Sequence, residues 1–178
     1  KSYPVDCYSG KYVILAGAGN NGGDGMAVAR HLMLMGMEVE LFLFSSPDKI
    51  AGDAKTNLEI LKKLDARMIP IEKFEDLAAL DEGLKDACLV IDAIFGTGLS
   101  RDIEGIIYEA IRRLNRQKIP VLAIDIPSGI HGESGHIMGI AVKATDTVTF
   151  GYPKQGHFLF PGREYMGRLH VVPISLPA

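Results

Sequence analysis

Strand-length apolar runs alternate with segments of helical periodicity along most of this 178-residue chain. Strands are predicted near residues 12–17, 38–44, 67–71, 88–94, 121–126, 144–150 and 168–174, and helices near residues 23–36, 48–65, 74–85 and 103–117. Such alternation is typical of a parallel sheet with helices on both faces. Near-continuous apolar runs such as Val13–Ala16 and Val121–Ile124 also indicate strands that are buried on both sides. The sequence therefore predicts an α/β fold.

The pattern changes after Ser128. Residues 129–139 are glycine-rich and irregular, and no convincing helical pattern separates the last two predicted strands. The chain contains no internal repeat, low-complexity tract or linker, and 178 residues suffice for one well-buried domain but are short for two. We expect a single domain over residues 1–178.

The composition excludes several classes of partner. The net charge is −3 and no cluster of Lys and Arg stands out, so we expect no nucleic-acid binding. No apolar stretch reaches membrane-spanning length and no signal-peptide pattern precedes the first strand, so no membrane partner is expected. Cys7 and Cys88 show neither zinc spacing nor a disulfide framework, which is consistent with the cytoplasm.

A glycine-rich segment joins the first predicted strand to the first predicted helix. Residues 17–25 read Gly-Ala-Gly-Asn-Asn-Gly-Gly-Asp-Gly and satisfy the dinucleotide fingerprint. Glycines let the backbone approach an anion, and the N–H groups at a helix start can bind phosphate. Asp24 is unexpected in such a loop, because it places a carboxylate where a phosphate would bind.

A conventional nicotinamide dehydrogenase also needs an acidic residue at the end of its second strand to hold the ribose hydroxyls. The second strand ends here in Ser45-Ser46-Pro47, and Glu40 lies near its start. The glycine fingerprint is therefore present without the acidic residue that would bind the ribose, which disfavours a simple hydride-transfer enzyme.

Two further predicted strands end in polar residues and glycines. One end carries Asp92 and then Gly96 and Gly98, and the other carries Asp125 and Ser128. Each taken alone fits a turn signal as well as a site. If the first and fourth strands are neighbours in a parallel sheet, however, all three strand ends line one crevice at the edge where such sheets bind ligands.

Oxygen donors gather at these ends. Asn21, Asp92 and Ser128 come from three strand ends without a histidine or cysteine among them, which suits a hard cation. One carboxylate with neutral oxygens favours a monovalent ion such as K⁺.

Lys154 and His157 follow in a segment rich in aromatic residues, where a structural role and a place at the crevice rim both remain open.

Three motifs in this order resemble those of the NAD(P)H-hydrate epimerases, the family of the YjeF amino-terminal domain. They read Asn20-Asn-Gly-Gly-Asp-Gly25, Asp92-Ala-Ile-Phe-Gly-Thr-Gly-Leu99 and Asp125-Ile-Pro-Ser-Gly129. The segment from Thr149 to Gly162 also resembles the closing region of that family. The resemblance covers Tyr12 to the C-terminus and implies a three-layer α/β/α Rossmann-like sandwich with a mostly parallel central sheet, commonly as a homodimer.

The resemblance implies an enzyme of metabolite repair. Its substrates would be NADHX and NADPHX, which carry a hydroxyl at C6 of the nicotinamide ring, and it would interconvert their R and S epimers for a dehydratase specific for one of them. Carried over by position, the K⁺ ligands would be Asn21, Asp92 and Ser128, and Asp125 would be catalytic. The cofactor-binding residues would be Asn20, Asn21, Gly22, Gly23, Asp24, Gly96, Thr97, Gly98, Leu99, Ser100, Arg101, Asp102 and Asp125.

Two departures from the family pattern accompany the resemblance. Family members usually carry helices before the first strand, whereas only Lys1–Lys11 precede it here, so we expect those helices to be missing. Many relatives are fused to a C-terminal ATP- or ADP-dependent dehydratase domain. This chain stops at Ala178, so that second activity is not expected in it.

Two mechanisms would both explain epimerisation. The C6 hydroxyl could leave reversibly, assisted by the ring-nitrogen lone pair with Asp125 as acid and base, or the ring could open.

The alternative function is a non-catalytic nucleotide- or RNA-binding scaffold domain of the same fold. Such a domain is expected to lose the acidic and asparagine positions, which this chain retains. An ordinary dinucleotide- or nucleoside-binding transferase would need a ribose-binding acidic residue, and the end of the second predicted strand carries none.

Overall fold

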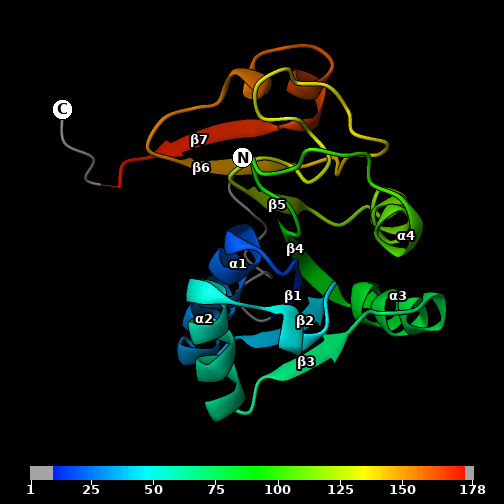
Figure 1. Cartoon of the computed structure of the whole chain (residues 1–178). Coiled ribbons are helices and arrows are strands. Elements are labelled where there is room, and N and C mark those ends of the chain that lie inside the picture. The colour runs from blue at the N-terminus through cyan, green and yellow to red at the C-terminus, as the bar shows by residue number, and fades with distance from the viewer. Residues whose placement is uncertain (1–9, 175–178) are drawn as a thin grey trace.

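A computed structural model of the protein describes residues 10–174. Seven strands form one sheet in the order β3-β2-β1-β4-β5-β6-β7, and every neighbouring pair is parallel (Figure 1). The strands are β1 (Lys11–Ala16), β2 (Glu38–Leu43), β3 (Arg67–Pro70), β4 (Ala87–Ala93), β5 (Val121–Ile124), β6 (Asp146–Phe150) and β7 (Arg168–Val172). The expected α/β fold with a parallel central sheet is confirmed.

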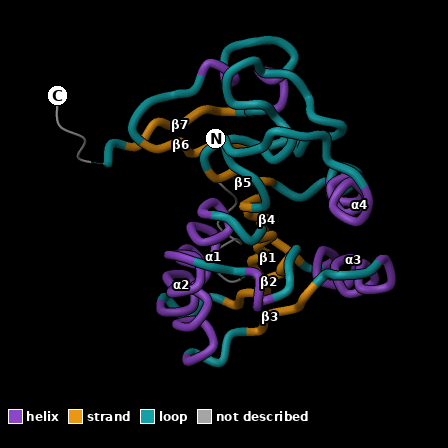
Figure 2. Tube along the Cα trace, in the orientation of Figure 1, coloured by secondary structure: helices purple, strands orange, loops and turns teal. Residues whose placement is uncertain are grey.

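Helices cover both faces of one half of the sheet. They are α1 (Asn20–Leu34), α2 (Gly52–Lys63), α3 (Leu77–Lys85) and α4 (Gly105–Leu114). In Figures 1 and 2, α1 and α2 lie on one side of the sheet and α3 and α4 on the other. Alternate residues of β1 supply the two cores: Ile14 packs in the cluster with α1 and α2, and Val13 and Leu15 in the cluster with α3 and α4. This two-sided burial explains the continuous apolar runs of the central strands.

The strand order reverses beside β1. The chain runs from β1 to β2 and β3, and then returns to place β4 along the other edge of β1. Because all seven strands are parallel, their carboxyl ends meet at one edge, and the reversal between β1 and β4 is where such sheets bind ligands. The expected adjacency of the first and fourth strands is confirmed.

Loops, and not helices, cover much of the C-terminal half of the sheet. Within the described residues, the connections between β5 and β7 contain only two short 3₁₀ turns, η4 (Gln155–His157) and η5 (Gly162–Tyr165). They enclose a small core of Ile126, Ile130, Ala141 and Met166. The change of pattern after Ser128 therefore corresponds to a change from helical to loop cover.

The start of every helix differs from the sequence-based expectation, and the third begins at Leu77 and not at 74, because Phe74–Asp76 form a separate 3₁₀ turn. The first helix begins at Asn20, three residues before the predicted start, because the glycines at 22, 23 and 25 are poor indicators of helix. The second begins at Gly52 and not at 48, because Pro47–Lys49 form a separate 3₁₀ turn. The fourth begins at Gly105, which has a positive φ of 62°.

Some expectations fall outside what the structure describes. Cys7 and most of the segment before β1 lie outside residues 10–174, so the expected lack of N-terminal helices is not addressed. Cys88 is half-buried and packs against the core beside α1 and α2. Among residues 10–174, no helix has both the length and the apolar character needed to cross a membrane.

Candidate functional site

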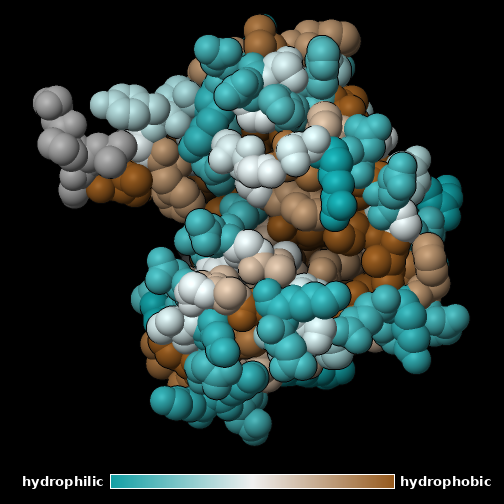
Figure 3. All heavy atoms as spheres, viewed as in Figure 1, coloured by the Kyte–Doolittle hydropathy of each residue, from teal (hydrophilic) through white to brown (hydrophobic). Residues whose placement is uncertain are grey.

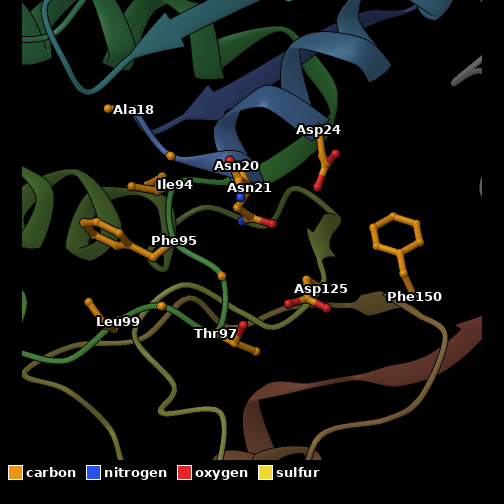
Figure 4. A pocket seen from close by; sticks show the side chains of 13 residues that line it. Ala18, Asn20, Asn21, Asp24, Ile94, Phe95, Thr97, Leu99, Asp125 and Phe150 are labelled. Carbon is orange, nitrogen blue, oxygen red and sulfur yellow. The ribbon is translucent and has the colours of Figure 1, made fainter. Parts of the chain in front are cut away.

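A cavity of about 620 Å³ opens at the carboxyl edge of the sheet, where β1 and β4 meet (Figure 4). On the face shown in Figure 3, the surface is hollowed between the part that carries α1 and α2 and the part that carries β6 and β7. The lining residues come from four strand ends: Ala18, Gly19, Asn20, Asn21, Asp24, Ile94, Phe95, Gly96, Thr97, Gly98, Leu99, Asp125 and Phe150.

The start of α1 forms one wall of the cavity. Gly19 is the N-cap, and no side chain caps the helix, so the first amide groups have no helical partner. At Gly22 a Cβ atom would overlap the carbonyl of Gly17, so only glycine lets the helix start this close to the strand end. Uncapped amides at a helix start can bind a phosphate group, and Asn20 and Asn21 line the cavity at that point.

A buried carboxyl joins the ends of β4 and β5. Asp92 is 0% exposed, and its Oδ2 accepts a hydrogen bond from the Ser128 amide at 2.8 Å. The Ser128 hydroxyl donates to Asp92 Oδ1 at 2.6 Å and accepts a bond from the Phe95 amide at 2.9 Å. Burial raises the pKa of Asp92 to about 6, against the effect of these hydrogen bonds, which favour the ionised form.

The amide of Asn21 is the unsatisfied polar group beside this network. The residue is 9% exposed, and neither its Oδ1 nor its Nδ2 has a hydrogen-bond partner among the described residues. Gly96 packs closely beside this amide, and a Cβ atom at Gly96 would lie 3.4 Å from Asn21 Oδ1. Buried polar atoms seldom remain without partners, so Asn21 Oδ1 is suited to a ligand.

These donors fit a hard monovalent cation. Asn21, Asp92 and Ser128 supply an amide oxygen, a carboxylate and a hydroxyl around the turn at residues 94–96. Within residues 10–174, no three or more His, Cys, Asp or Glu side chains are grouped so that they could hold a metal ion. Asn21, Asp92 and Ser128 are therefore the candidate K⁺ ligands, and their role stays a prediction.

Asp125 lies on the opposite wall in a conformation unusual for an aspartate. Its φ is 68°, in the left-handed region, and its amide donates to the Val148 carbonyl at 2.7 Å. A non-glycine residue in this region is uncommon, and such residues cluster at functional sites. The carboxyl forms an ion pair with the Lys154 ammonium, and it accepts a hydrogen bond from the Thr149 hydroxyl at 3.1 Å.

His157 fixes the backbone of Asp125 from behind. The Lys154 amide donates to Nδ1 of His157 at 3.0 Å, so the ring proton lies on Nε2, which donates to the Asp125 carbonyl at 2.9 Å. Burial lowers the pKa of His157 and favours this neutral form. His157 therefore has a structural role beneath the site, and Lys154 reaches the site itself through Asp125.

Asp24 faces Asp125 across the cavity. It projects from the second turn of α1, and in Figure 4 its carboxyl group extends toward the side of the cavity on which Asp125 lies. Partial withdrawal from water and, secondarily, the charge of Asp125 raise the pKa of Asp24. The acid that seemed misplaced in a phosphate loop thus points away from the start of the helix and into the cavity.

The structure brings most of the predicted cofactor-binding residues to this cavity, but not all of them. Gly22 and Gly23 lie behind its wall, against Gly17 and against Ala54 of α2. The predicted residues that line the cavity are Asn20, Asn21, Asp24, Gly96, Thr97, Gly98, Leu99 and Asp125.

Two of the remaining predicted residues line a neighbouring cavity. Arg101 and Asp102 belong to a hollow of about 430 Å³ that shares Phe95 and Leu99 with the first. Ser100 is exposed and lines neither. A long ligand could therefore extend from one cavity into the other past Leu99.

Sequence reasoning missed the contribution of β6. Thr149 and Phe150 stand at a fourth strand end, and the Lys154 ammonium donates to the Thr149 hydroxyl at 2.8 Å and to the Phe150 carbonyl. No motif spacing marks Thr149 or Phe150 as site residues, whereas the sequence leaves a place at the crevice rim open for Lys154. The position of Thr149 and Phe150 at the end of a predicted strand could have identified them, because all strands of a parallel sheet place their last residues at the same edge.

Other residues considered from the sequence have structural surroundings. Glu40 is buried in β2 and pairs with Lys11 and Arg67, remote from the place where a ribose-binding acid would stand. Arg112 and Arg113 pair with Glu109 on α4. The His170 imidazole contacts the carboxyl of Asp146, which is also bound by Arg168.

Comparisons with known proteins show which family the chain resembles. Residues 5–156 match the family described as YjeF-related protein N-terminus. A protein of Limosilactobacillus fermentum named NAD(P)H-hydrate epimerase is 41% identical over 169 residues, which cover 95% of this chain and 76% of that protein. One of Weissella koreensis with the same name is 39% identical over 164 residues, covering 92% of this chain and 70% of that protein.

Longer relatives and a solved structure also match. A Thermofilum pendens protein named bifunctional NAD(P)H-hydrate repair enzyme Nnr is 44% identical over 164 residues, which cover 92% of this chain but 31% of that protein. This chain thus spans about a third of the length of its bifunctional relatives.

The crystal structure of the yeast protein ynu0 has the same fold, with a TM-score of 0.78 and 24% identity, covering 96% of this chain and 69% of that one. From the match over residues 5–156 and the identities near 40%, the chain belongs to the YjeF-related N-terminal domain family.

Proposed function

We propose that this protein is an NAD(P)H-hydrate epimerase, which interconverts the R and S epimers at C6 of NADHX and NADPHX. The observation that carries the proposal is the placement of Asp125. Its carboxyl stands, in a strained backbone conformation, opposite a helix start that can bind phosphate in the same cavity. Relatives that carry the epimerase name are similar over 92–95% of the chain.

The proposed mechanism is reversible loss of the C6 hydroxyl. The lone pair of the ring nitrogen assists departure of the hydroxyl, and Asp125 acts as acid and base, giving a proton to a departing hydroxyl or taking one from an incoming water. The phosphate groups bind at the amides of α1, which orients the nicotinamide ring toward Asp125. Lys154 and Thr149 hold the Asp125 carboxyl in place.

A single-epimer assay tests this function. Purified protein is added to R-NADHX, and the appearance of S-NADHX is followed by NMR or chiral chromatography. We expect interconversion far above the rate without protein, and Asp125→Asn should lower that rate by about 10²–10⁴-fold while still binding NADH. An unchanged rate with intact protein would exclude the epimerase function.

K⁺ is proposed as the resident cation, held by Asn21, Asp92 and Ser128. When bound, it would supply fixed positive charge beside the phosphate-binding start of α1. A ligand that binds the folded state raises the unfolding temperature with its concentration. We expect KCl to raise that temperature more than choline chloride at equal ionic strength, and Asn21→Ala to abolish the difference. Equal effects of the two salts would contradict the site.

A dehydratase and a second copy of the chain are the proposed partners. The bifunctional names of longer relatives support a dehydratase as the enzyme that consumes one epimer. The consecutive exposed side chains of Phe158, Leu159 and Phe160 support a homodimer, because such apolar groups favour burial. Sedimentation equilibrium should give twice the chain mass, and a monomer at all concentrations would contradict the homodimer.

A further inference from the structure

The cavity carries a carboxyl group on each of two facing walls. Asp24 reaches it from α1 and Asp125 from the end of β5, and Figure 4 shows open space between the two carboxyl groups. A hydrated nicotinamide ring placed in this space would present one of its two faces to each aspartate. One carboxyl per face is more than the binding of a phosphate or a ribose would require.

The two carboxyl groups have different surroundings. Asp125 is paired with the Lys154 ammonium and bonded by the Thr149 hydroxyl. Asp24 has neither a hydrogen-bond nor an ion-pair partner within residues 10–174, and partial withdrawal from water together with the charge of Asp125 raises its pKa. Unequal environments of two nearby carboxyl groups are the usual basis for separate acid and base roles.

We propose that Asp24 is a second catalytic residue, and that Asp24 and Asp125 serve opposite faces of the C6 carbon. This inference rests on the proposed epimerase function and deepens it. Inversion at C6 requires the hydroxyl to leave one face and to return on the other. A group on one wall alone can reach only one of these faces.

The step balances with these two groups and water. On one face the protonated aspartate gives its proton to the C6 hydroxyl, the C–O bond breaks, and water departs as the ring nitrogen forms a double bond to C6. On the other face a water molecule adds to C6 and gives its proton to the second aspartate, while the electron pair returns to nitrogen. Nothing is oxidised or reduced, and the two aspartates exchange protonation states. The reverse reaction or proton exchange with solvent resets them.

Oxygen exchange distinguishes this two-face mechanism from its alternatives. In oxygen-18-labelled water, each inversion by the wild-type protein should place one labelled oxygen at C6, as mass spectrometry of the separated epimers would show. Ring opening with closure on the other face would invert C6 with the original oxygen retained. If the inverted epimer that forms first carries no oxygen-18, the proposal is overturned.

The two aspartate variants should fail in opposite ways. Asp24→Asn should invert C6 about 10²–10⁴-fold more slowly, yet still exchange oxygen in the one epimer whose hydroxyl faces Asp125. Asp125→Asn should instead retain exchange in the other epimer. NADH binding and thermal unfolding establish that each variant is folded, and Asp48→Asn, on an exposed turn, should behave as wild type.

The outcomes separate this inference from the proposed function. If the wild-type protein does not interconvert the epimers, the proposed function itself fails. If it does, but folded Asp24→Asn inverts at the wild-type rate, only the role of Asp24 fails. Exchange in both epimers, or in neither, by Asp24→Asn would also overturn the assignment of one aspartate to each face.

Discussion

At the scale of single residues, the chemistry of the site depends on side chains that hold Asp125. Its positive φ of 68° is maintained from three directions, by the Val148 carbonyl, by Nε2 of His157 and by the Lys154 ammonium. A strained residue remains strained only where its surroundings enforce the conformation. Variants of these supporting residues should therefore affect catalysis without removing the reacting carboxyl.

Lys154→Met should lower the rate of epimerisation at saturating substrate with little change in KM. The substitution removes the cation and the hydrogen bonds that fix Asp125, and hydrogen bonds to charged groups contribute about 1.5–3 kcal/mol. That range corresponds to a rate loss of roughly 10- to 150-fold. Lys154→Arg, which keeps the charge, should recover part of the rate, and exposed Lys143→Met is the control. A rise in KM alone would place Lys154 in substrate binding.

His157 should make the protein less stable as the pH falls. The unfolded chain protonates this histidine near its ordinary pKa of 6.5, whereas burial lowers the pKa in the folded state. Between the two values the unfolded state binds more protons, so the free energy of unfolding decreases as pH drops below 6.5. In His157→Gln, which can keep both hydrogen bonds, urea denaturation at pH 7.5 and pH 5 should show a smaller loss. An equal loss in both proteins would refute this linkage.

At the scale of elements, the close contact between α1 and the sheet forms the site. Gly25 of α1 faces β4 so closely that a Cβ atom would lie 2.5 Å from the Cβ of Ala93. Gly19, at the N-cap, has no atom within 4 Å of such a Cβ and an ordinary φ of −86°. The glycines of this segment thus have different structural roles: Gly25 permits close packing on β4, whereas Gly19 is not in close contact with other elements.

Gly25→Ala and Gly19→Ala form a matched pair that tests this difference. Gly25→Ala should push α1 away from β4 and lower the free energy of unfolding by about 1–3 kcal/mol, the usual cost of overpacking. Gly19→Ala creates no clash and only replaces glycine by a poorer N-cap residue, so it should lower the free energy of unfolding by less, about 0.5 kcal/mol. Denaturation followed by circular dichroism measures both, and equal effects would show that α1 adapts to the extra methyl group.

The sequence predicted the elements better than it predicted the walls of the site. Strands and helices follow from hydrophobic periodicity, which is a local property, and the adjacency of β1 and β4 follows from the rules for parallel sheets. The start of α1 was set too late because packing, and not propensity, makes residues 20–22 helical. The ion pair of Lys154 with Asp125 joins residues 29 positions apart, and no local pattern specifies it.

At the scale of the whole molecule, one continuous sheet connects a helix-covered half and a loop-covered half. The cluster beside α1 and α2 contains Leu61, whereas Met166 belongs to the small core beneath the C-terminal loops. The cavity draws its walls from both halves. Function therefore requires both to be folded at the same time.

The chain should unfold in a single cooperative transition, as expected for a domain of this size. Leu61→Ala and Met166→Ala lie in different halves, and each should cost about 2–5 kcal/mol because it opens a cavity in a packed core. Both should lower the midpoint of the same calorimetric transition. Two separable transitions, with each variant shifting only one of them, would show that the halves are independent domains.

The fixed tautomer of His157 has a further consequence. Its Nε2 proton is bonded to the Asp125 carbonyl and buried, with the residue 2% exposed, so its exchange with solvent is hindered. Such a proton gives a separate nuclear magnetic resonance signal, downfield of the backbone amides. Because the carbonyl belongs to the residue whose side chain faces the cavity, this one resonance reports from inside the protein on whatever occupies the site, without any label on the ligand.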